Sequence, residues 1–289
     1  MSDNDDDEYV LRDGIHVSPK PVCHREEEYD SRTFDLLRAM QQKHFWYLGR
    51  HRFLLHALLR CQRKYLASIE ACRAVDLGGG CGGWIEYVRR HAASFSPSFA
   101  LADSSELALR HAGRLLGAAT PLYQVDLMDL RWSNRWDVAF LLDVLEHVPD
   151  QKAVLRSIRK ALAPGGLVLI TVPALQIFWT WNDEEAHHQR RYKRGDFEQL
   201  AIETGLELLD ARYFMFFLSP LLLASRWLTA PRQAADSAAR ANLAKRMHKI
   251  PFGPLNAGLA AVFRAETPLG HRIRFPWGTS LFCVLRKPA

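Results

Sequence analysis

The chain has 289 residues and a net charge of +6, and 48% of its residues are hydrophobic and 24% charged. These values exclude a disordered chain, a collagen-like fibre and a coiled-coil rod. Five cysteines without a CxxC pair argue against a disulfide framework or a zinc knuckle and favour a reducing compartment. The sequence has no run of about 18 apolar residues, and its acidic first residues lack the apolar core of a secretory signal. We therefore expect a cytoplasmic protein.

The charge is distributed unevenly along the chain. Residues 1–30 hold ten acidic and three basic residues, whereas residues 211–289 hold twelve basic residues and two acidic ones. We expect residues 1–28 to be a disordered acidic tail and residues 29–289 to be one domain. The basic C-terminal third suits a solvated surface, or one that meets nucleic acid, an anionic membrane or an acidic partner.

Helical spacing of apolar residues predicts two helices over 34–59 that meet near 44–50. Short apolar runs then alternate with helical segments, an order typical of a parallel sheet with helices on both faces. The predicted strands are 74–77, 99–103, 122–126, 136–143, 167–172, 206–214 and 279–285, and the clearest helices between them are 84–91, 150–162 and 194–205.

About 60 residues separate the last two predicted strands, too many for a plain hairpin. We expect a helical insertion there, at about 215–277. Its apolar start, 213–228, suits a lid over the acceptor, a homodimer face or a surface that touches lipid. A basic helix is predicted at about 234–249, so a peripheral membrane contact through 213–249 is one expectation and a homodimer another.

A glycine-rich turn, GGGCGG at 78–83, follows the first strand of the alternating region. Glycines let the backbone approach a ligand closely, and the next helix points its N-terminus at the site. Gly78, Gly80 and Gly83 also satisfy GxGxxG, the fingerprint of nicotinamide-binding proteins, which alone is a weak signal. Acidic residues before the turn and after the next strands favour a different cofactor.

Five motifs occur in order: VDLGGGCG at 75–82, Asp103, Asp126-Leu127, LLDVLEHV at 141–148 and LRSIRKALAPGG at 155–166. Together they resemble the motifs of class I S-adenosylmethionine (SAM)-dependent methyltransferases. The resemblance implies an α/β, Rossmann-like, mostly parallel sheet of seven strands in the order 3-2-1-4-5-7-6. It also implies an N-terminal helical cover, SAM as cofactor and methyl transfer as the reaction.

Three outer segments, HFWYLGR at 44–50, FWTWND at 178–183 and HQRRY at 188–192, resemble signatures of a bacterial subgroup of small-molecule methyltransferases. PWGTS at 276–280 resembles the entry to its last strand. The subgroup covers most of the chain but names no substrate. Cys81 departs from the family pattern and is either a small hydrophobic filler or a reactive thiol.

The chemistry of SAM gives the candidate residues their roles. Asp76 can neutralise the ammonium group, and glycine N–H groups can receive the carboxylate. Arg50 either bonds to that carboxylate or forms a surface ion pair. The resemblance places Asp103 at the ribose hydroxyls, and Trp46 is either a cation–π partner of the sulfonium, with Tyr47 and Trp179, or a core aromatic. The candidate cofactor-binding residues are Trp46, Arg50, Asp76, Gly78, Gly80, Asp103, Ser104, Asp126, Leu127 and Asp143.

Methyl transfer to a hydroxyl or an amine also requires removal of a proton. The candidate catalytic residues are His147, His188 and Tyr192. His147 follows the fourth strand, where open α/β sheets place ligands, but it also suits a helix cap. His188 suits either acceptor recognition or a salt-bridged surface. The twelve histidines show no ligand-type cluster in the sequence, so we predict no metal.

The predicted function is SAM-dependent methylation of a small molecule, such as a biosynthetic intermediate. Two alternatives keep the fold: cyclisation of SAM itself to azetidine-2-carboxylate with release of methylthioadenosine, and a non-catalytic SAM-binding subunit of a biosynthetic complex. Nucleic-acid methylation is disfavoured because DVLE stands at 143–146 in place of an Asn/Asp-Pro-Pro-aromatic motif.

Overall fold

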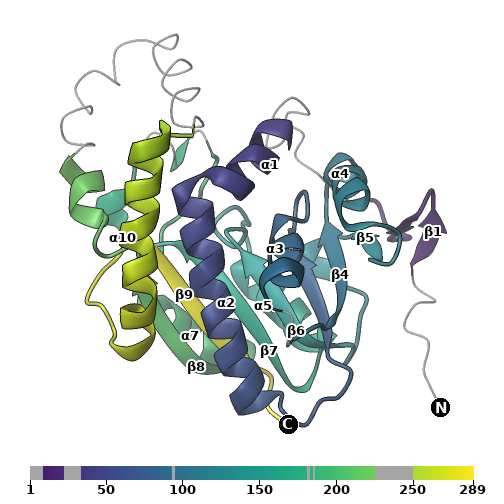
Figure 1. Cartoon of the computed structure of the whole chain (residues 1–289). Coiled ribbons are helices and arrows are strands. Elements are labelled where there is room, and N and C mark those ends of the chain that lie inside the picture. Colours follow the sequence, from purple (N-terminus) through teal and green to yellow (C-terminus); the bar gives the residue numbers. More distant parts are fainter. Residues whose placement is uncertain (1–8, 23–33, 93–94, 181–182, 185, 225–249) are drawn as a thin grey trace.

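The computed structural model describes residues 9–22, 34–92, 95–180, 183–184, 186–224 and 250–289. In these ranges a central sheet lies between two layers of helices (Figure 1). The strands are β1 (Val10–Arg12), β2 (Ile15–Val17), β3 (Arg73–Leu77), β4 (Ser98–Asp103), β5 (Leu122–Gln124), β6 (Trp136–Leu142), β7 (Leu162–Pro173), β8 (Glu207–Phe214) and β9 (Ser280–Arg286). The helices are α1 (Phe34–Lys43), α2 (Phe45–Tyr65), α3 (Gly83–His91), α4 (Glu106–Leu116), α5 (Gln151–Ala161), α7 (Arg194–Thr204) and α10 (Gly253–Arg272), with short 3-10 helices η4 (Leu127–Asp129) and η5 (Gln176–Phe178).

Among the described residues, the sheet has nine strands in the order β1-β2-β5-β4-β3-β6-β7-β9-β8. The prediction of seven strands is therefore wrong, because β1 and β2 extend the sheet beyond β5. The strands from β3 onward lie in the succession 3-2-1-4-5-7-6 within this larger sheet. Neighbours from β2 to β7 are parallel, and β9 runs antiparallel between β7 and β8. The sheet is thus mostly parallel, and the α/β class is confirmed.

The two extra strands come from the segment that the sequence predicts to be a disordered tail. β1 and β2 form an antiparallel hairpin, and β2 pairs in parallel with β5. Tyr9 packs its ring against Tyr123 and Trp132, and its hydroxyl accepts a hydrogen bond from the Arg131 N–H at 3.1 Å. Two buried apolar side chains, Tyr9 and Ile15, therefore anchor an otherwise acidic segment. The rest of the predicted tail, 1–8 and 23–28, lies outside the described residues.

Each face of the sheet has its own apolar core. On one face, the buried side chains of α5 and α7 pack against the strands, among them Leu155 and Phe197. On the other, α2, α3, α4 and α10 contribute side chains such as Phe53, Ile85 and Phe263. The continuous apolar strands that the sequence shows follow from this arrangement, since a sheet covered on both faces buries every side chain of its central strands.

The helical cover and the insertion are joined by α2 and α10, which lie side by side and run in the same direction (Figure 1). His44 separates α1 from α2 and caps α2 by accepting from the Trp46 N–H. Asn256 of α10 accepts from the Phe45 N–H at 3.0 Å and donates to the Lys43 carbonyl at 2.8 Å. The insertion thus fixes the point at which α2 begins.

Gly49 lies where α2 packs against the Phe263 ring of α10. A Cβ atom at this position would overlap the ring of Phe263 on α10. We expect Gly49→Ala to lower the free energy of unfolding by about 1–3 kcal/mol, because the two helices would have to move apart. Gly258→Ala on α10 is the matched control: no atom of the described residues lies within 4 Å of its Cβ position, so the better helix propensity of alanine should raise stability by about 1 kcal/mol. Thermal unfolding of both variants measures the difference, and equal effects would contradict the packing argument.

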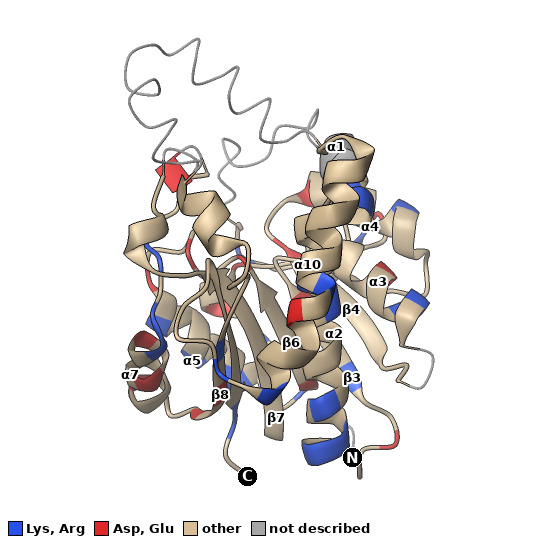
Figure 2. Cartoon of the chain, turned by 60° about the vertical axis from the view of Figure 1, so that its left-hand side comes forward, with Lys and Arg blue, Asp and Glu red and all other residues tan. Residues whose placement is uncertain are grey.

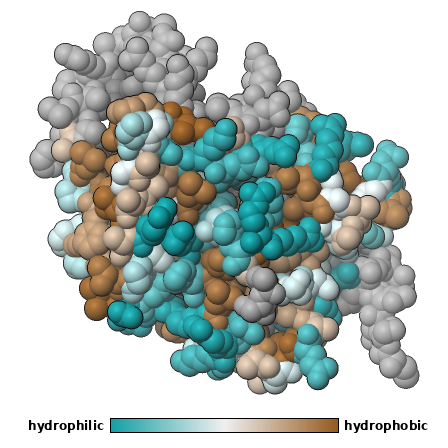
Figure 3. All heavy atoms as spheres, viewed as in Figure 1, coloured by the Kyte–Doolittle hydropathy of each residue, from teal (hydrophilic) through white to brown (hydrophobic). Residues whose placement is uncertain are grey.

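The outer surface of the insertion carries exposed apolar side chains. Leu255, Val262 and Leu269 of α10, and Phe252 directly before it, are each more than a third exposed, and apolar residues gather over this helix in Figure 3. The predicted basic helix at 234–249 lies outside the described residues, so the membrane contact and the homodimer stay predictions. Among the described helices, none has the length and apolar character needed to cross a membrane. Lys and Arg residues are spread over several helices in Figure 2.

Candidate active site

The carboxyl ends of β3, β4 and β6 meet at one edge of the sheet, because these strands are parallel neighbours in aligned register. The glycine turn leaves β3 at this edge and leads into α3. Gly78 has φ +69°, and a Cβ atom there would lie 2.6 Å from Val144. Only glycine fits this position without strain. The turn therefore brings backbone, rather than side chains, to the edge of the sheet.

Asp76, the fourth residue of β3, is the least satisfied acidic group at this edge. Its side chain is 1% exposed, and neither carboxylate oxygen has a hydrogen-bond partner among the described residues. Burial raises the pKa of Asp76 to about 7, with the charge of Arg50 acting in the opposite direction and that of Asp103 adding to the rise. A Cβ on Gly79 would lie 2.8 Å from the Asp76 Oδ2, so the glycine turn passes directly over this carboxylate. A buried carboxylate that lacks a hydrogen-bond partner among the described residues is suited to a cationic ligand.

Asp103 closes β4 and connects the first two loops of the site. Its Oδ2 accepts from the Gly80 N–H at 2.9 Å, and its Oδ1 accepts from the Ser105 N–H at 2.9 Å. A carboxylate oxygen can accept more than one hydrogen bond, so backbone bonds of this kind can fix the group beside a ligand that it also binds. Ser104 follows directly and is half-buried. This geometry suits a ligand with two adjacent hydroxyl groups.

Arg50 enters the same edge from α2. The guanidinium forms an ion pair with Asp143, which follows β6 with the unusual backbone angle φ +56°. The ring centres of Trp46 and Tyr47 lie 4.9 Å and 5.3 Å from the Arg50 Cζ. The structure therefore pairs Arg50 with Asp143 and places the two aromatic rings near the guanidinium. The contacts to the cofactor carboxylate and sulfonium, which the sequence offers as one of two alternatives, stay predictions.

The remaining predicted cofactor residues lie beyond β5. Asp126 caps η4 by accepting from the Met128 N–H at 2.9 Å, and Leu127 is half-buried against the core. β5 is the parallel neighbour of β4, so both residues lie at the same edge as Asp103. All of the predicted cofactor-binding residues thus belong to the carboxyl edge of the sheet or to the α2 segment beside it. With the unsatisfied Asp76 and the open glycine turn, they fit the ammonium, ribose and adenine groups of SAM.

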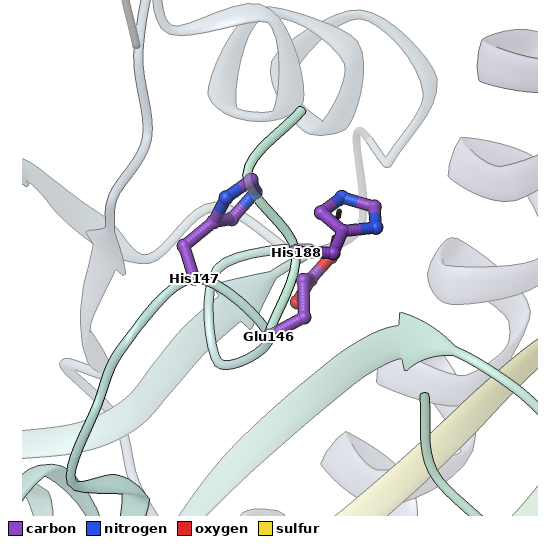
Figure 4. Close-up of side chains that lie close together, drawn as sticks. All are labelled: Glu146, His147 and His188. Carbon is purple, nitrogen blue, oxygen red and sulfur yellow. Dashed lines mark ion pairs between the residues drawn. The ribbon is translucent and has the colours of Figure 1, made fainter. Parts of the chain in front are cut away.

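A second group lies just past β6. Glu146, His147 and His188 come together so that one possible ligand atom from each lies within 4.8 Å of the others (Figure 4). The rings of His147 and His188 meet edge to face with their centres 4.8 Å apart. Burial and then the neighbouring His188 lower the pKa of His147 to about 4, and burial followed by the charge of Asp143 raises the pKa of Glu146 well above its usual value.

The sequence missed the residues that hold this cluster in place. Asp183 is fully buried and accepts from the His188 Nδ1 at 2.9 Å and from the Arg191 Nε at 2.8 Å. Its own burial favours the neutral form, but the bonds from His188, Arg191 and Thr180 outweigh that effect and hold the pKa of Asp183 below its usual value. The Gln189 N–H donates to the Glu146 carbonyl at 2.8 Å, which joins the two loops.

Two of the three predicted catalytic residues, His147 and His188, lie in this cluster, and Tyr192 does not. The Tyr192 ring is 1% exposed, and its hydroxyl donates to the Leu145 carbonyl at 3.1 Å. Burial raises the pKa of Tyr192, so the position favours a structural role. Cys81 is also buried, as expected for a small hydrophobic filler.

The sequence predicts no metal, because the spacing of its histidines shows no cluster of metal ligands. Glu146 is adjacent to His147 in the sequence, but His188 joins them only through the loop that follows β7. Asp183 and His188 lie five residues apart in the sequence. This short separation is the one feature of the sequence that points to the hydrogen bond between them.

Known proteins resemble this chain in sequence motifs and in fold. Residues 45–211 match a methyltransferase domain family. The CurJ carbon methyltransferase has 15% identity and a TM-score of 0.56, with 90% of this chain and 62% of that chain covered. The [4+2]-cyclase SpnF has 20% identity and a TM-score of 0.54, with coverage of 96% and 100%. Phosphoethanolamine N-methyltransferase 2 of Haemonchus contortus, solved with SAM, has 18% identity and a TM-score of 0.50, with coverage of 90% and 60%.

No curated protein sequence matches the chain. At these identities the structural similarities show the fold alone, whereas the family match spans more than half of the chain. It includes the glycine turn, Asp76, Asp103 and the Glu146–His188 region. The chain therefore belongs to the methyltransferase domain family, as a transferase that uses SAM as its cofactor.

Proposed function

We propose that the protein transfers the methyl group of SAM to a small-molecule acceptor, such as a biosynthetic intermediate, at the carboxyl edge of the sheet. The observation that carries the proposal is Asp76, a fully buried carboxylate without a hydrogen-bond partner among the described residues. The ammonium group of SAM would supply the missing positive charge. Asp103 is then the acceptor for the ribose hydroxyls, and the glycine turn lets the cofactor lie close to the backbone.

The acceptor is proposed to lie between the cofactor and the cluster of Glu146, His147 and His188. Asp143 stands at the boundary, because it pairs with Arg50 on one side and precedes Glu146 by three residues on the other. Methyl transfer is an in-line displacement, so the protein mainly aligns the two reactants and excludes water. For a hydroxyl or an amine, the histidine–carboxylate cluster would promote loss of the acceptor proton.

The similar structures do not select the acceptor atom. One is described as a carbon methyltransferase, one as a nitrogen methyltransferase and one as a cyclase. The same fold therefore accommodates different reactions, and the acceptor must be identified by experiment.

The test is calorimetric titration of the protein with SAM, followed by mass spectrometry of the same mixture. We expect SAM to bind and to remain intact until an acceptor is added, when S-adenosylhomocysteine appears. His147→Ala and His188→Ala should each lower turnover by about 10²- to 10⁴-fold with little change in SAM affinity. Conversion of SAM alone to methylthioadenosine would contradict the proposal, and so would intact SAM after incubation with a broad panel of acceptors.

A further inference from the structure

We propose that Glu146, His147 and His188 bind one divalent transition-metal ion, and that this ion holds an oxygen atom of the methyl acceptor. The role toward the acceptor rests on the proposed function, whereas ion binding itself does not. The proposal starts from the side-chain cluster drawn in Figure 4.

Asp183 fixes the position of one proton on the His188 ring. Its Nδ1 lies 2.9 Å from the Asp183 Oδ1, and a carboxylate can only accept, so Nδ1 carries the proton. When the ring carries this single proton, its Nε2 presents a lone pair toward the Glu146 Oε1, 4.0 Å away. That distance is too long for a hydrogen bond between the two groups.

The other two side chains of the cluster carry buried polar atoms without partners. The Glu146 Oε2 and the His147 Nδ1 are buried and have no hydrogen-bond partner among the described residues. Carboxyl oxygens and imidazole nitrogens converge here, no hydrogen bond among the described residues joins the three side chains, and buried polar atoms without partners are costly. A cation at the centre would satisfy all three side chains at once.

The distances between the three ligand atoms are close to those around a single metal ion. Metal–ligand distances of about 2.0–2.2 Å place two ligands on opposite sides of an ion about 4.2 Å apart. The three ligand atoms of the cluster lie within 4.8 Å of one another, so small side-chain rotations bring them into range. Asp183 supports the arrangement as the outer partner of His188, and its own carboxylate is held by Arg191. A carboxylate that orients a ligating histidine in this way is a common feature of metal sites.

Ligand chemistry selects the kind of ion. Two imidazoles and one carboxylate favour a first-row transition metal over magnesium or calcium, which prefer oxygen ligands. Three protein ligands leave coordination positions for an acceptor oxygen. The ion would lower the pKa of that hydroxyl, whose proton passes to solvent water. The new O–CH₃ bond forms as the S–CH₃ bond of SAM breaks, which yields a methyl ether, S-adenosylhomocysteine and one proton.

The experiment uses the full-length chain, stripped with a chelator and titrated with Co²⁺. We expect one ion per chain, with the visible absorption of protein-bound cobalt. Glu146→Gln and His188→Ala should weaken Co²⁺ binding by at least about 100-fold. His56→Ala, at an exposed position of α2, is the control and should bind like the wild type. Titration of every variant with SAM shows that its fold is intact.

The outcomes separate the ion from the reaction. Absence of stoichiometric Co²⁺ binding in a wild-type protein that still binds SAM would overturn the ion site and leave the methyltransferase proposal standing. Co²⁺ binding that Glu146→Gln and His188→Ala leave unchanged would overturn the site as well. Conversely, Co²⁺ binding that these two variants lose, in a protein that methylates no acceptor, would support the ion site and count against the proposed function.

Discussion

Asp76→Asn is expected to stabilise the SAM-free protein at pH 8 and to weaken SAM binding by about 100-fold, the value of one charge-assisted hydrogen bond. The pKa of Asp76 is raised to about 7 in the folded protein, chiefly by burial, from an ordinary value of 3.8. The folded state therefore holds this proton more tightly than the unfolded state does. Between about pH 4 and pH 7 the protein loses stability as the pH rises, by up to about 4 kcal/mol for a shift of this size. Asparagine carries no charge at any pH, so the variant does not lose stability in this way as the pH rises.

Calorimetric unfolding at pH 5 and pH 8, together with SAM titration, measures both effects of Asp76→Asn. The wild type should lose more thermal stability between the two pH values than the variant does. Asp137→Asn is the matched control: this buried aspartate near the opposite end of β6 accepts from the Arg73 N–H at 2.8 Å. It should lose stability while keeping its affinity for SAM. If Asp76→Asn bound SAM like the wild type, Asp76 would not be the partner of the ammonium group.

Asp183→Asn is expected to lower the free energy of unfolding by about 3–5 kcal/mol, the cost of leaving a buried charge without its partner. The Asp183 carboxylate is fully buried and accepts from Arg191, His188 and Thr180. An asparagine offers one acceptor oxygen and no charge, so the guanidinium of Arg191 would remain buried without compensation. In a chain of this size the melting temperature should fall by about 6–20 °C.

The pH dependence of the same variant gives a second measurement. Because the bonds to Asp183 outweigh its burial and lower its pKa, its contribution is present at neutral pH and is lost as the pH falls through the folded-state pKa. The difference between wild type and variant should thus be constant from pH 6 to pH 8 and shrink below about pH 4. Thr180→Val, which removes only one hydroxyl bond to Asp183, should cost about 1 kcal/mol. Equal losses in the two variants would contradict the ion-pair argument.

Local sequence patterns predict the central strands and the edge of the sheet at which Asp76 and Asp103 lie. β3, β4 and β6 are apolar runs that end at a glycine turn or an aspartate, and parallel strands place those ends at one edge. Asp76 and Asp103 could therefore be assigned to this edge from the sequence. Their hydrogen-bonding state could not, because it depends on how deeply the turn covers them.

Contacts between distant segments account for what the sequence did not predict. The N-terminal hairpin consists of two three-residue strands whose partner, β5, is more than 100 residues away in the sequence. Composition alone therefore indicated a disordered tail. Likewise, His188 and Glu146 come together only because the loop after β7 folds back over the end of β6, which pattern analysis cannot foresee.

The pairing of α2 with α10 has a consequence for synthesis of the chain. The Phe45 N–H and the Asn256 side chain that accepts from it are 211 residues apart. At about 5–20 residues per second, a ribosome needs about 10–40 s to make a stretch of this length. During that time α2, which carries Arg50, has no α10 to pack against, and β9 has not yet entered between β7 and β8. The nascent protein therefore completes its cofactor site only when almost the whole chain has left the ribosome.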